Sequence, residues 1–328
     1  MTNETILRPL YLAKILNERT DEDHWLSTVQ LCQILRDEYG FDTHRQTLNK
    51  DIQMLQKTGM DIHCQKSTQN RYRVMSRHFQ LAELKLLIDA VASSKFISKK
   101  KSAELAVKLA SLAGNHKEEE LKRHISVENR IKSGNEKTLL IIDAINEAIN
   151  QKRQIRFQYF KYNSKKKREP KWDGYWYHMS PHSLVWNGDY YYVIGFAEKY
   201  GSVVSYRVDR MVSPPEIMEA KAYPMPKGFN LDKHINSMFR MYSDSSARTE
   251  VTLLCENDVM DAIIDRFGEK VNTEPADEDH FRAFVSIAVN KVFFSWIFGF
   301  EGAVRIEGPE EVQKQYRKMV LDASKRVK

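Results

Sequence analysis

A polar stretch near residue 45 carries side chains that could read DNA. Groups able to hydrogen-bond base edges or phosphates lie opposite an aliphatic stripe, Leu48, Ile52 and Leu55, which recurs at helical spacing. These polar residues are Thr43, His44, Arg45, Gln46, Asn49, Lys50 and Gln53. The combination predicts a helix that enters the major groove of duplex DNA. The solvated face of an ordinary surface helix is the alternative interpretation.

Two further helices precede this segment. The first begins near Pro9, and the second begins at Ser27, whose hydroxyl can cap it while Gln30 completes a capping box. The same spacing predicts that Thr43 caps the third helix and that Gln46 completes its box. Two capped helices in such close succession are typical of a helix-turn-helix.

A β-hairpin is predicted directly after the third helix. Its strands are expected at residues 60–63 and 71–74, on either side of a polar turn. The second strand carries Arg71 and Arg73, which we expect to hold the DNA backbone beside the groove. Residues 1–75 are therefore predicted to form a winged helix-turn-helix DNA-binding domain.

Positive charge begins abruptly at residue 43. Residues 1–42 contain 4 basic and 8 acidic side chains, whereas residues 43–73 contain 6 basic and 2 acidic ones. Residues 223–328 contain 15 basic and 17 acidic side chains and have no general attraction for polyanions. This contrast favours DNA binding by the N-terminal domain more strongly than the formal net charge of +7 does.

The remaining chain divides by its periodicity into four parts. Residues 76–135 are expected to form a helical linker, and residues 136–222 a small β-barrel of short, closely spaced strands. A connector over residues 223–248 leads to residues 249–328, whose β-α-β-β-α-β order predicts a ferredoxin-like domain. The apolar segment Phe293–Phe300 is interpreted as a helix packed on that domain's sheet. The 328 residues thus predict a multi-domain α+β protein.

The sequence lacks the motifs of common catalytic and metal sites. HExxH, GxSxG, GxGxxG and the phosphate-binding GxxxxGK motif do not occur, and the ten histidines lack metal-ligand spacing. We therefore expect neither an enzyme nor a bound metal or cofactor. Three distant cysteines and no apolar stretch of membrane-spanning length predict a cytoplasmic protein without a membrane partner.

Part of the expected β-domain resembles a known family. Tyr191-Tyr192-Val193 is similar to the Trp-Tyr-Leu signature of WYL domains, with tyrosine and valine as departures. Residues 206–211 resemble the closing stretch of that domain, and residues 43–55 resemble the recognition helix of WYL-domain transcription regulators. The order of the predicted domains is similar as well. The resemblance implies a bacterial or phage origin, transcription regulation and an Sm-like barrel for the WYL domain.

The resemblance also implies a cationic pocket in the barrel that senses single-stranded DNA or nucleotides. Arginines supply bidentate contacts to phosphate oxygens, and aromatic rings supply stacking. The candidate residues are His182, Tyr191, Tyr192, Arg207 and Arg210. Because side chains alternate along a strand, Tyr191 and Tyr192 face opposite ways, and one of them belongs to the core. A structural ion pair of these arginines with Asp209 is the alternative.

The leading hypothesis is a regulator that binds double-stranded operator DNA and responds to an anionic, nucleic-acid-derived effector. One short recognition helix reads few base pairs, so we expect a homodimer on an inverted repeat. Its contacts are expected in the linker helices and in the C-terminal domain with Phe293–Phe300. Two rivals stay open: an enzyme acting on nucleotides, and a non-catalytic RNA- or single-strand-binding protein that uses the barrel. Repressor or activator does not follow from the sequence.

Overall fold

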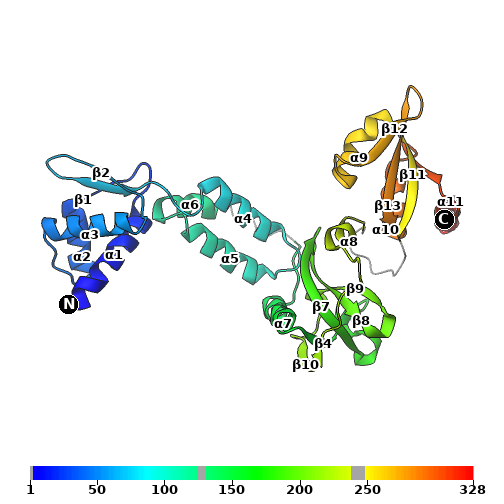
Figure 1. Ribbon diagram of the computed structural model, residues 1–328, viewed down its shortest axis with the longest axis horizontal. Helices are drawn as coiled ribbons and strands as arrows, with labels where there is room; N and C mark the ends of the chain where they lie inside the picture. The colour runs from blue at the N-terminus through cyan, green and yellow to red at the C-terminus, as the bar shows by residue number, and fades with distance from the viewer. Residues whose placement is uncertain (1–2, 124–130, 238–247, 328) are drawn as a thin grey trace. The chain divides into compact units, whose positions relative to one another are not determined.

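The computed structural model describes residues 3–123, 131–237 and 248–327. These residues form an α+β protein whose strands pair in antiparallel sheets (Figure 1). The chain divides into two compact units, residues 1–136 and 137–328, which are described separately. The five-part division expected from the sequence stays a prediction.

The first unit begins with three helices and a small sheet. The helices are α1 (Asn3–Arg19), α2 (Thr28–Tyr39) and α3 (Arg45–Lys57), and the strands are β1 (Leu26–Ser27), β2 (Ile62–Gln65) and β3 (Arg71–Val74). The sheet has the order β1-β3-β2. Aliphatic residues from all three helices share one core with Ile62, Tyr72 and Val74 of the sheet. The stripe Leu48, Ile52 and Leu55 of α3 is buried there.

The capping box at Ser27 is confirmed, whereas the one at Thr43 is wrong. The Ser27 hydroxyl accepts from the Gln30 amide, and the Gln30 side chain accepts from the Ser27 amide at 2.8 Å. Helix α3 instead has His44 as its N-cap residue, without a side-chain cap. Thr43 is buried, and its hydroxyl donates to the Phe41 carbonyl at 3.3 Å. Packing inward therefore excludes the capping role.

Three more helices complete the first unit: α4 (Leu81–Ser93), α5 (Lys99–Ser111) and α6 (Asn115–Arg123). Their shared core includes Leu84, Ile88, Ala106, Ala110 and Leu121. All three lie in the segment expected to be a helical linker.

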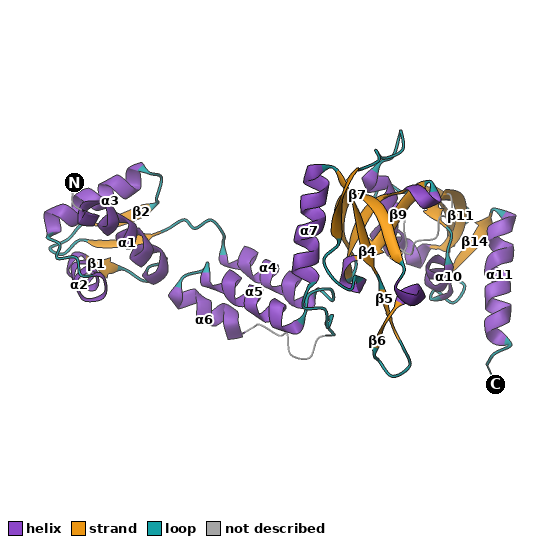
Figure 2. Cartoon of the chain, turned by 90° about the horizontal axis from the view of Figure 1, so that it is seen from below, coloured by secondary structure: helices purple, strands orange, loops and turns teal. Residues whose placement is uncertain are grey.

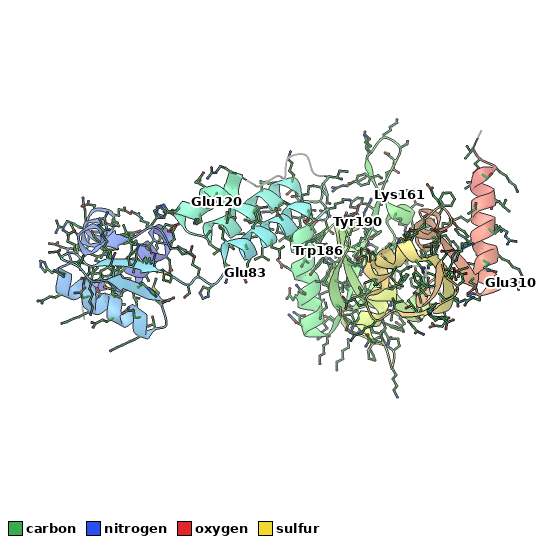
Figure 3. All side chains as sticks on the ribbon, turned by 90° about the horizontal axis from the view of Figure 1, so that it is seen from above. Glu83, Glu120, Lys161, Trp186, Tyr190 and Glu310 are labelled. Atoms are coloured by element: carbon green, nitrogen blue, oxygen red, sulfur yellow. The ribbon has the colours of Figure 1, made fainter. Side chains whose placement is uncertain are left out.

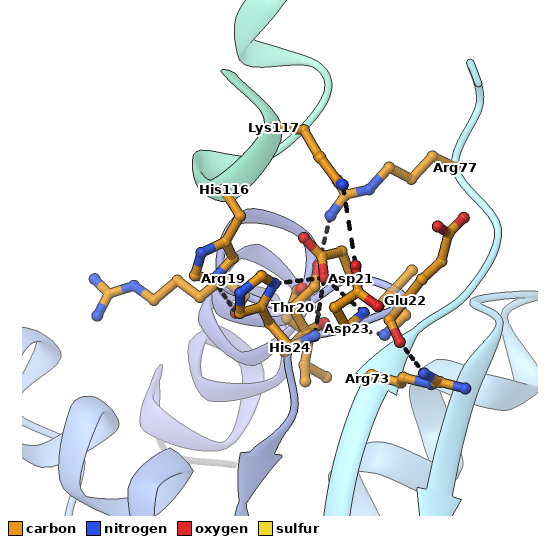
Figure 4. Close-up of polar contacts among 12 residues, drawn as sticks. Arg19, Thr20, Asp21, Glu22, Asp23, His24, Arg73, Arg77, His116 and Lys117 are labelled. Carbon is orange, nitrogen blue, oxygen red and sulfur yellow. Dashed lines mark hydrogen bonds and ion pairs between the residues drawn. The ribbon is translucent and has the colours of Figure 1, made fainter. Parts of the chain in front are cut away.

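Polar contacts join the end of α1 to Arg77, which lies just before α4, and to α6 (Figure 4). The Arg77 guanidinium donates to the carbonyls of Asn17 at 2.7 Å and Thr20 at 2.6 Å. Gly114 has a φ of +82° and leaves room for Arg77, because a Cβ there would lie 2.7 Å from a guanidinium nitrogen. The rings of His24 and His116 stack at 3.6 Å. The junction is therefore built from specific polar contacts.

The second unit begins with α7 (Thr138–Gln151) and a five-stranded sheet. Its strands are β4 (Arg153–Gln158), β7 (Trp176–Asn187), β8 (Tyr190–Ala197), β9 (Ser202–Arg207) and β10 (Glu216–Lys221), in the order β10-β4-β7-β8-β9. Helix α7 packs Ile141 and Ile145 against Ile155 and Phe157 of the sheet. Backbones of β7 and β8 approach closely at Gly195, where a Cβ would overlap the Ser180 carbonyl oxygen.

Two details of this sheet differ from the sequence interpretation. Strand β7 is continuous where two strands, at residues 175–179 and 182–186, were expected, because it absorbs a register irregularity between Pro181 and Ser183. A hairpin of β5 (Phe160–Tyr162) and β6 (Arg168–Pro170), which was not expected, extends from the sheet (Figure 2).

The C-terminal part of the second unit is a four-stranded sheet with helices. It comprises β11 (Arg248–Glu256), α9 (Met260–Phe267), β12 (Asn272–Pro275), β13 (His280–Ala288), α10 (Lys291–Phe298), β14 (Val304–Gly308) and α11 (Glu310–Ser324). The sheet order is β12-β13-β11-β14. A short helix, α8 (Leu231–Ser237), precedes it.

Helix α10 packs on this sheet, as expected. Phe293, Phe294 and Ile297 are buried in the core of the sheet. These side chains are therefore unavailable for the intermolecular contact that the sequence suggested for Phe293–Phe300, although Phe298 is exposed.

Candidate DNA-contacting and ligand-binding surfaces

The outer face of α3 presents a set of exposed polar side chains. Four of the expected base-reading residues are exposed: Arg45, Gln46, Lys50 and Gln53. They are held in place by the buried stripe on the opposite side of the same helix. The exposed N-cap residue His44 lies directly before them. These side chains can therefore reach a partner without unfolding the domain.

Asn49 is tied to the hairpin rather than fully exposed. Its side-chain oxygen accepts a hydrogen bond from the Tyr72 hydroxyl at 2.7 Å. Tyr72 is itself buried, and burial raises the pKa of its hydroxyl. The neutral phenol is thus a permanent donor that fixes the orientation of the Asn49 amide.

An ion pair that sequence reasoning missed anchors α3 to α1. The Arg8 guanidinium contacts both carboxylate oxygens of Asp51, at 2.6 and 3.2 Å. The two side chains are only 13% and 9% exposed, so water screens the pair little. Asp51 lies within the segment, residues 43–55, that resembles the recognition helix of WYL-domain regulators, and no local signal linked it to a partner 43 residues away.

The two expected wing arginines differ in their surroundings. Arg71 is exposed at the start of β3. Arg73 is half-buried, lies 4.2 Å from the ring centre of Trp25 and donates to the Glu22 carbonyl. Arg71 is thus the wing cation that can meet a phosphate without giving up another contact.

A hollow of about 470 Å³ lies beside the start of α3. It is lined by α2, by Thr43, His44 and Arg45, and by Thr68 and Gln69 of the hairpin turn. Thr43 contributes to its wall but is too buried to read a base. This part of the expected DNA-contacting set is therefore structural.

In the second unit, Arg207 is held by an acid and an aromatic ring. It forms a bidentate contact with Asp209, at 3.1 and 2.8 Å, and lies 3.2 Å from the ring centre of Tyr190. Burial disfavours its charged form, but the Asp209 carboxylate outweighs this and raises the pKa of Arg207. The structural ion pair is therefore present for Arg207. Tyr190, which sequence reasoning missed, can be located in Figure 3.

Arg210 has other neighbours. Its guanidinium lies 5.0 Å from the ring centre of Tyr162 and 5.7 Å from that of Phe160, both on β5. A short 3-10 turn at Val208–Arg210 separates it from the strand that carries Arg207. The two arginines therefore have different aromatic partners.

The remaining expected ligand residues are also dispersed. Tyr191 packs in the cluster beneath α7, whereas Tyr192 is buried in a second cluster with Ile194, on the face that carries Tyr190. Burial raises the pKa of Tyr192 to about 12. A ring nitrogen of His182 lies 2.7 Å from the Tyr223 carbonyl oxygen. The structure thus brings Arg207 near Tyr190 and Tyr192 but places His182 and Tyr191 in other surroundings.

Side chains that could bind a metal ion are dispersed over the described ranges. His, Cys, Asp and Glu do not gather there in groups of three that could hold a metal ion. No helix in the same ranges combines the length and apolar character needed to cross a membrane.

Comparisons with known proteins identify one region of the chain. Residues 141–215 match the model of the WYL domain. The match begins within α7 and ends just before β10. No curated protein matches the chain.

Two solved structures resemble the chain weakly. Proteasome accessory factor B/C (PafBC) of Arthrobacter aurescens is 16% identical over 95% of this chain and 45% of its own, with a TM-score of 0.27. The chain thus spans less than half of that protein. A CRISPR Cas-related protein is 14% identical over 98% of this chain and 83% of its own, with a TM-score of 0.37.

Proposed function

Because residues 141–215 form a WYL domain, we propose that this chain is a DNA-binding transcription regulator. In this proposal residues 1–75 act as a winged helix-turn-helix that reads duplex operator DNA. The WYL domain acts as an Sm-like sensor of an anionic, nucleic-acid-derived ligand, and the C-terminal part is a ferredoxin-like extension. Catalysis has no place in this function, and the protein acts in the cytoplasm.

The observation that carries the proposal is the outer face of α3. Arg45, Gln46 and Lys50 are exposed on a helix whose other face is locked into a core. A rigid helix with exposed donors is what major-groove reading requires. Arg71, exposed on the neighbouring strand, adds a cation for the adjacent phosphates.

Ligand sensing is supported by the surroundings of Arg207 and Arg210. Each guanidinium lies against aromatic rings, so a phosphate group and a base could be bound side by side. Arg210 is the better candidate for direct phosphate contact, because the guanidinium of Arg207 is already engaged by Asp209.

A homodimer on an inverted repeat remains part of the proposal. Two-fold symmetry doubles the number of base pairs read by one short helix. Light scattering of the purified chain, free and with DNA, measures this directly. A stable monomer of 38.4 kDa in both conditions contradicts it.

The decisive experiment selects DNA from a random duplex pool with the purified full chain and sequences the bound fragments. We expect one enriched motif with two-fold symmetry. Replacing Arg45 and Gln46 by alanine should abolish the enrichment, whereas a surface change away from this face, Gln315→Ala on α11, should preserve it. Preferential retention of RNA, or retention of DNA without an enriched motif, contradicts the proposal.

A further inference from the structure

A cavity of about 320 Å³ opens at the end of the five-stranded sheet where β8 turns into β9. Tyrosines from separate segments of the chain dominate its lining: Tyr175, Tyr177, Tyr200, Tyr206 and Tyr223. Three of these rings, Tyr175, Tyr200 and Tyr223, are between 37% and 53% exposed. Large aromatic surfaces are thus left open to a ligand at one place.

The inner wall of this tyrosine cavity is rigid. Tyr177 is buried, and its ring packs edge-on against Tyr175 at 5.0 Å and Tyr206 at 5.4 Å. Burial raises the pKa of both Tyr177 and Tyr206, so their hydroxyls keep their protons. A preformed wall of rings reduces the ordering cost of binding.

Lys199 places a positive charge at the rim of the cavity. Its ammonium lies 4.6 Å from the ring centre of Tyr175 and donates to the Tyr175 hydroxyl at 3.0 Å. The carboxylate of the neighbouring Glu198 accepts a hydrogen bond from the Tyr223 hydroxyl at 2.6 Å, and the ammonium of Lys199 also lies 5.7 Å from the ring centre of Tyr200. The charge of Lys199 is therefore held by neutral groups and can be matched by an anion.

The tyrosine cavity is separate from the surroundings of Arg207. Tyr206 and Arg207 are neighbours on β9, so their side chains leave opposite faces of the sheet. Lys199 and Tyr200 lie in the β8–β9 turn, whereas Arg207 pairs with Tyr192 near the other end of this hairpin. The pair nearest the turn is Ala197 with Ser202. Five residues of strand, about 17 Å, separate it from the pair of Tyr192 with Arg207.

We propose that the tyrosine cavity is a second ligand site, which takes a small planar aromatic molecule bearing an anionic group, such as a nucleoside monophosphate. The ring of the ligand stacks on the exposed faces of Tyr200 and Tyr223, and its anionic group meets the ammonium of Lys199. The volume lies at the lower end of the range for small-molecule sites, which favours a monomer over a polymer. The site depends on neither the DNA-contacting face nor the arginines.

Calorimetry on the full chain tests the site with AMP, GMP, CMP and UMP, each against its nucleoside, and with inorganic phosphate. At least one monophosphate should bind more tightly than its nucleoside and than phosphate. Lys199→Gln should weaken the binding of that monophosphate roughly tenfold and leave the binding of the nucleoside unchanged. Tyr200→Leu should weaken the binding of both the monophosphate and its nucleoside roughly tenfold. Lys161→Gln, the same charge change on β5, should have no effect.

Three outcomes overturn the proposal. The first is that none of the four monophosphates binds at millimolar concentration to a chain whose thermal unfolding is normal. The second is that Lys199→Gln and Tyr200→Leu bind like the original chain. The third is that Arg210→Gln abolishes binding while Lys199→Gln spares it, which assigns the nucleotide to the arginine region. DNA selection is a separate measurement, so a failure here leaves the proposed function standing.

Discussion

The Tyr72 hydroxyl donates a 2.7 Å hydrogen bond to Oδ1 of Asn49, and this bond joins the buried side of the hairpin to the outer face of α3. Because Oδ1 accepts from Tyr72, the amide nitrogen of Asn49 is the group directed toward a partner. The hairpin thus contributes to DNA reading in two ways: through Arg71, and by orienting a residue on the helix.

Tyr72→Phe should relax the selectivity of DNA binding while preserving the fold. The ring stays in the core and only the hydrogen bond is lost, at about 1 kcal/mol of unfolding free energy. Binding to the selected motif and to variants with single base changes measures the effect. Tyr39→Phe on α2 is the matched control. Unchanged discrimination in Tyr72→Phe would show that Asn49 needs no such orientation.

Arg45→Ala and Arg71→Ala should weaken DNA binding in different ways. Loss of a base-reading side chain should cost about 1–3 kcal/mol on the selected motif and little elsewhere. Loss of a phosphate contact should weaken all sequences similarly and reduce the slope of log affinity against log salt by about 1. Salt titrations on the selected and a scrambled duplex separate the two. Equal effects of both variants on both duplexes contradict the assignment.

Asp51→Ala should destabilise the first unit by about 3 kcal/mol, because it leaves the largely buried Arg8 without its carboxylate. The double change Arg8→Met with Asp51→Leu should recover most of that loss, since it removes both charges. Urea unfolding monitored by circular dichroism gives the free energies. A single variant as stable as the original chain would show that the ion pair contributes nothing.

Arg207→Ala and Arg210→Ala should separate a structural role from a ligand role. The former removes the guanidinium that neutralises Asp209, which is only 4% exposed, and should lower the midpoint of thermal unfolding. The latter should leave that midpoint unchanged and reduce binding of a fluorescent single-stranded oligonucleotide, measured by anisotropy. The division of roles fails if Arg210→Ala unfolds the domain or binds the oligonucleotide normally.

Cys255 should resist alkylation in the folded chain, whereas the exposed Cys64 should react. Burial raises the pKa of the Cys255 thiol to about 12. Since the folded state retains this proton more strongly than the unfolded state, its contribution to stability is complete below the unfolded pKa of about 9 and decreases as pH rises above it. Mass spectrometry of chains labelled at pH 8, native and in urea, checks the order. Rapid native labelling of Cys255 would refute its protected state.

The sequence predicted helices and strands correctly where the periodicity of the apolar residues was by itself enough to define them. Buried stripes at helical spacing identified α3, and strand alternation placed Tyr191 and Tyr192 in different clusters. The capping box predicted at Thr43 does not form, although the spacing to Gln46 is right. Tertiary packing buries Thr43, and its hydroxyl donates to the Phe41 carbonyl instead of capping α3. The spacing of residues in the sequence shows which local hydrogen bonds are possible, whereas tertiary packing determines which of them form.

The expected ligand residues are dispersed for a different reason. Arg207 and Arg210 are three residues apart, but the 3-10 turn between them breaks the alternation of the strand and sends them to different rings. The tyrosine cavity gave no sequence signal at all. Its lining comes from segments between Gln154 and Tyr223 that only the sheet topology brings together.

The contact between Arg73 and Trp25 allows the first unit to be followed by tryptophan fluorescence. Trp25 is the only tryptophan among residues 1–136, and the guanidinium of Arg73 lies 4.2 Å from its ring. The emission of this indole depends on the charge that lies over it, and Arg73 belongs to the same strand as Arg71. A chain whose other four tryptophans are replaced by phenylalanine therefore carries a built-in fluorophore beside the hairpin. Stopped-flow mixing with duplexes can then follow docking in real time, without an attached dye.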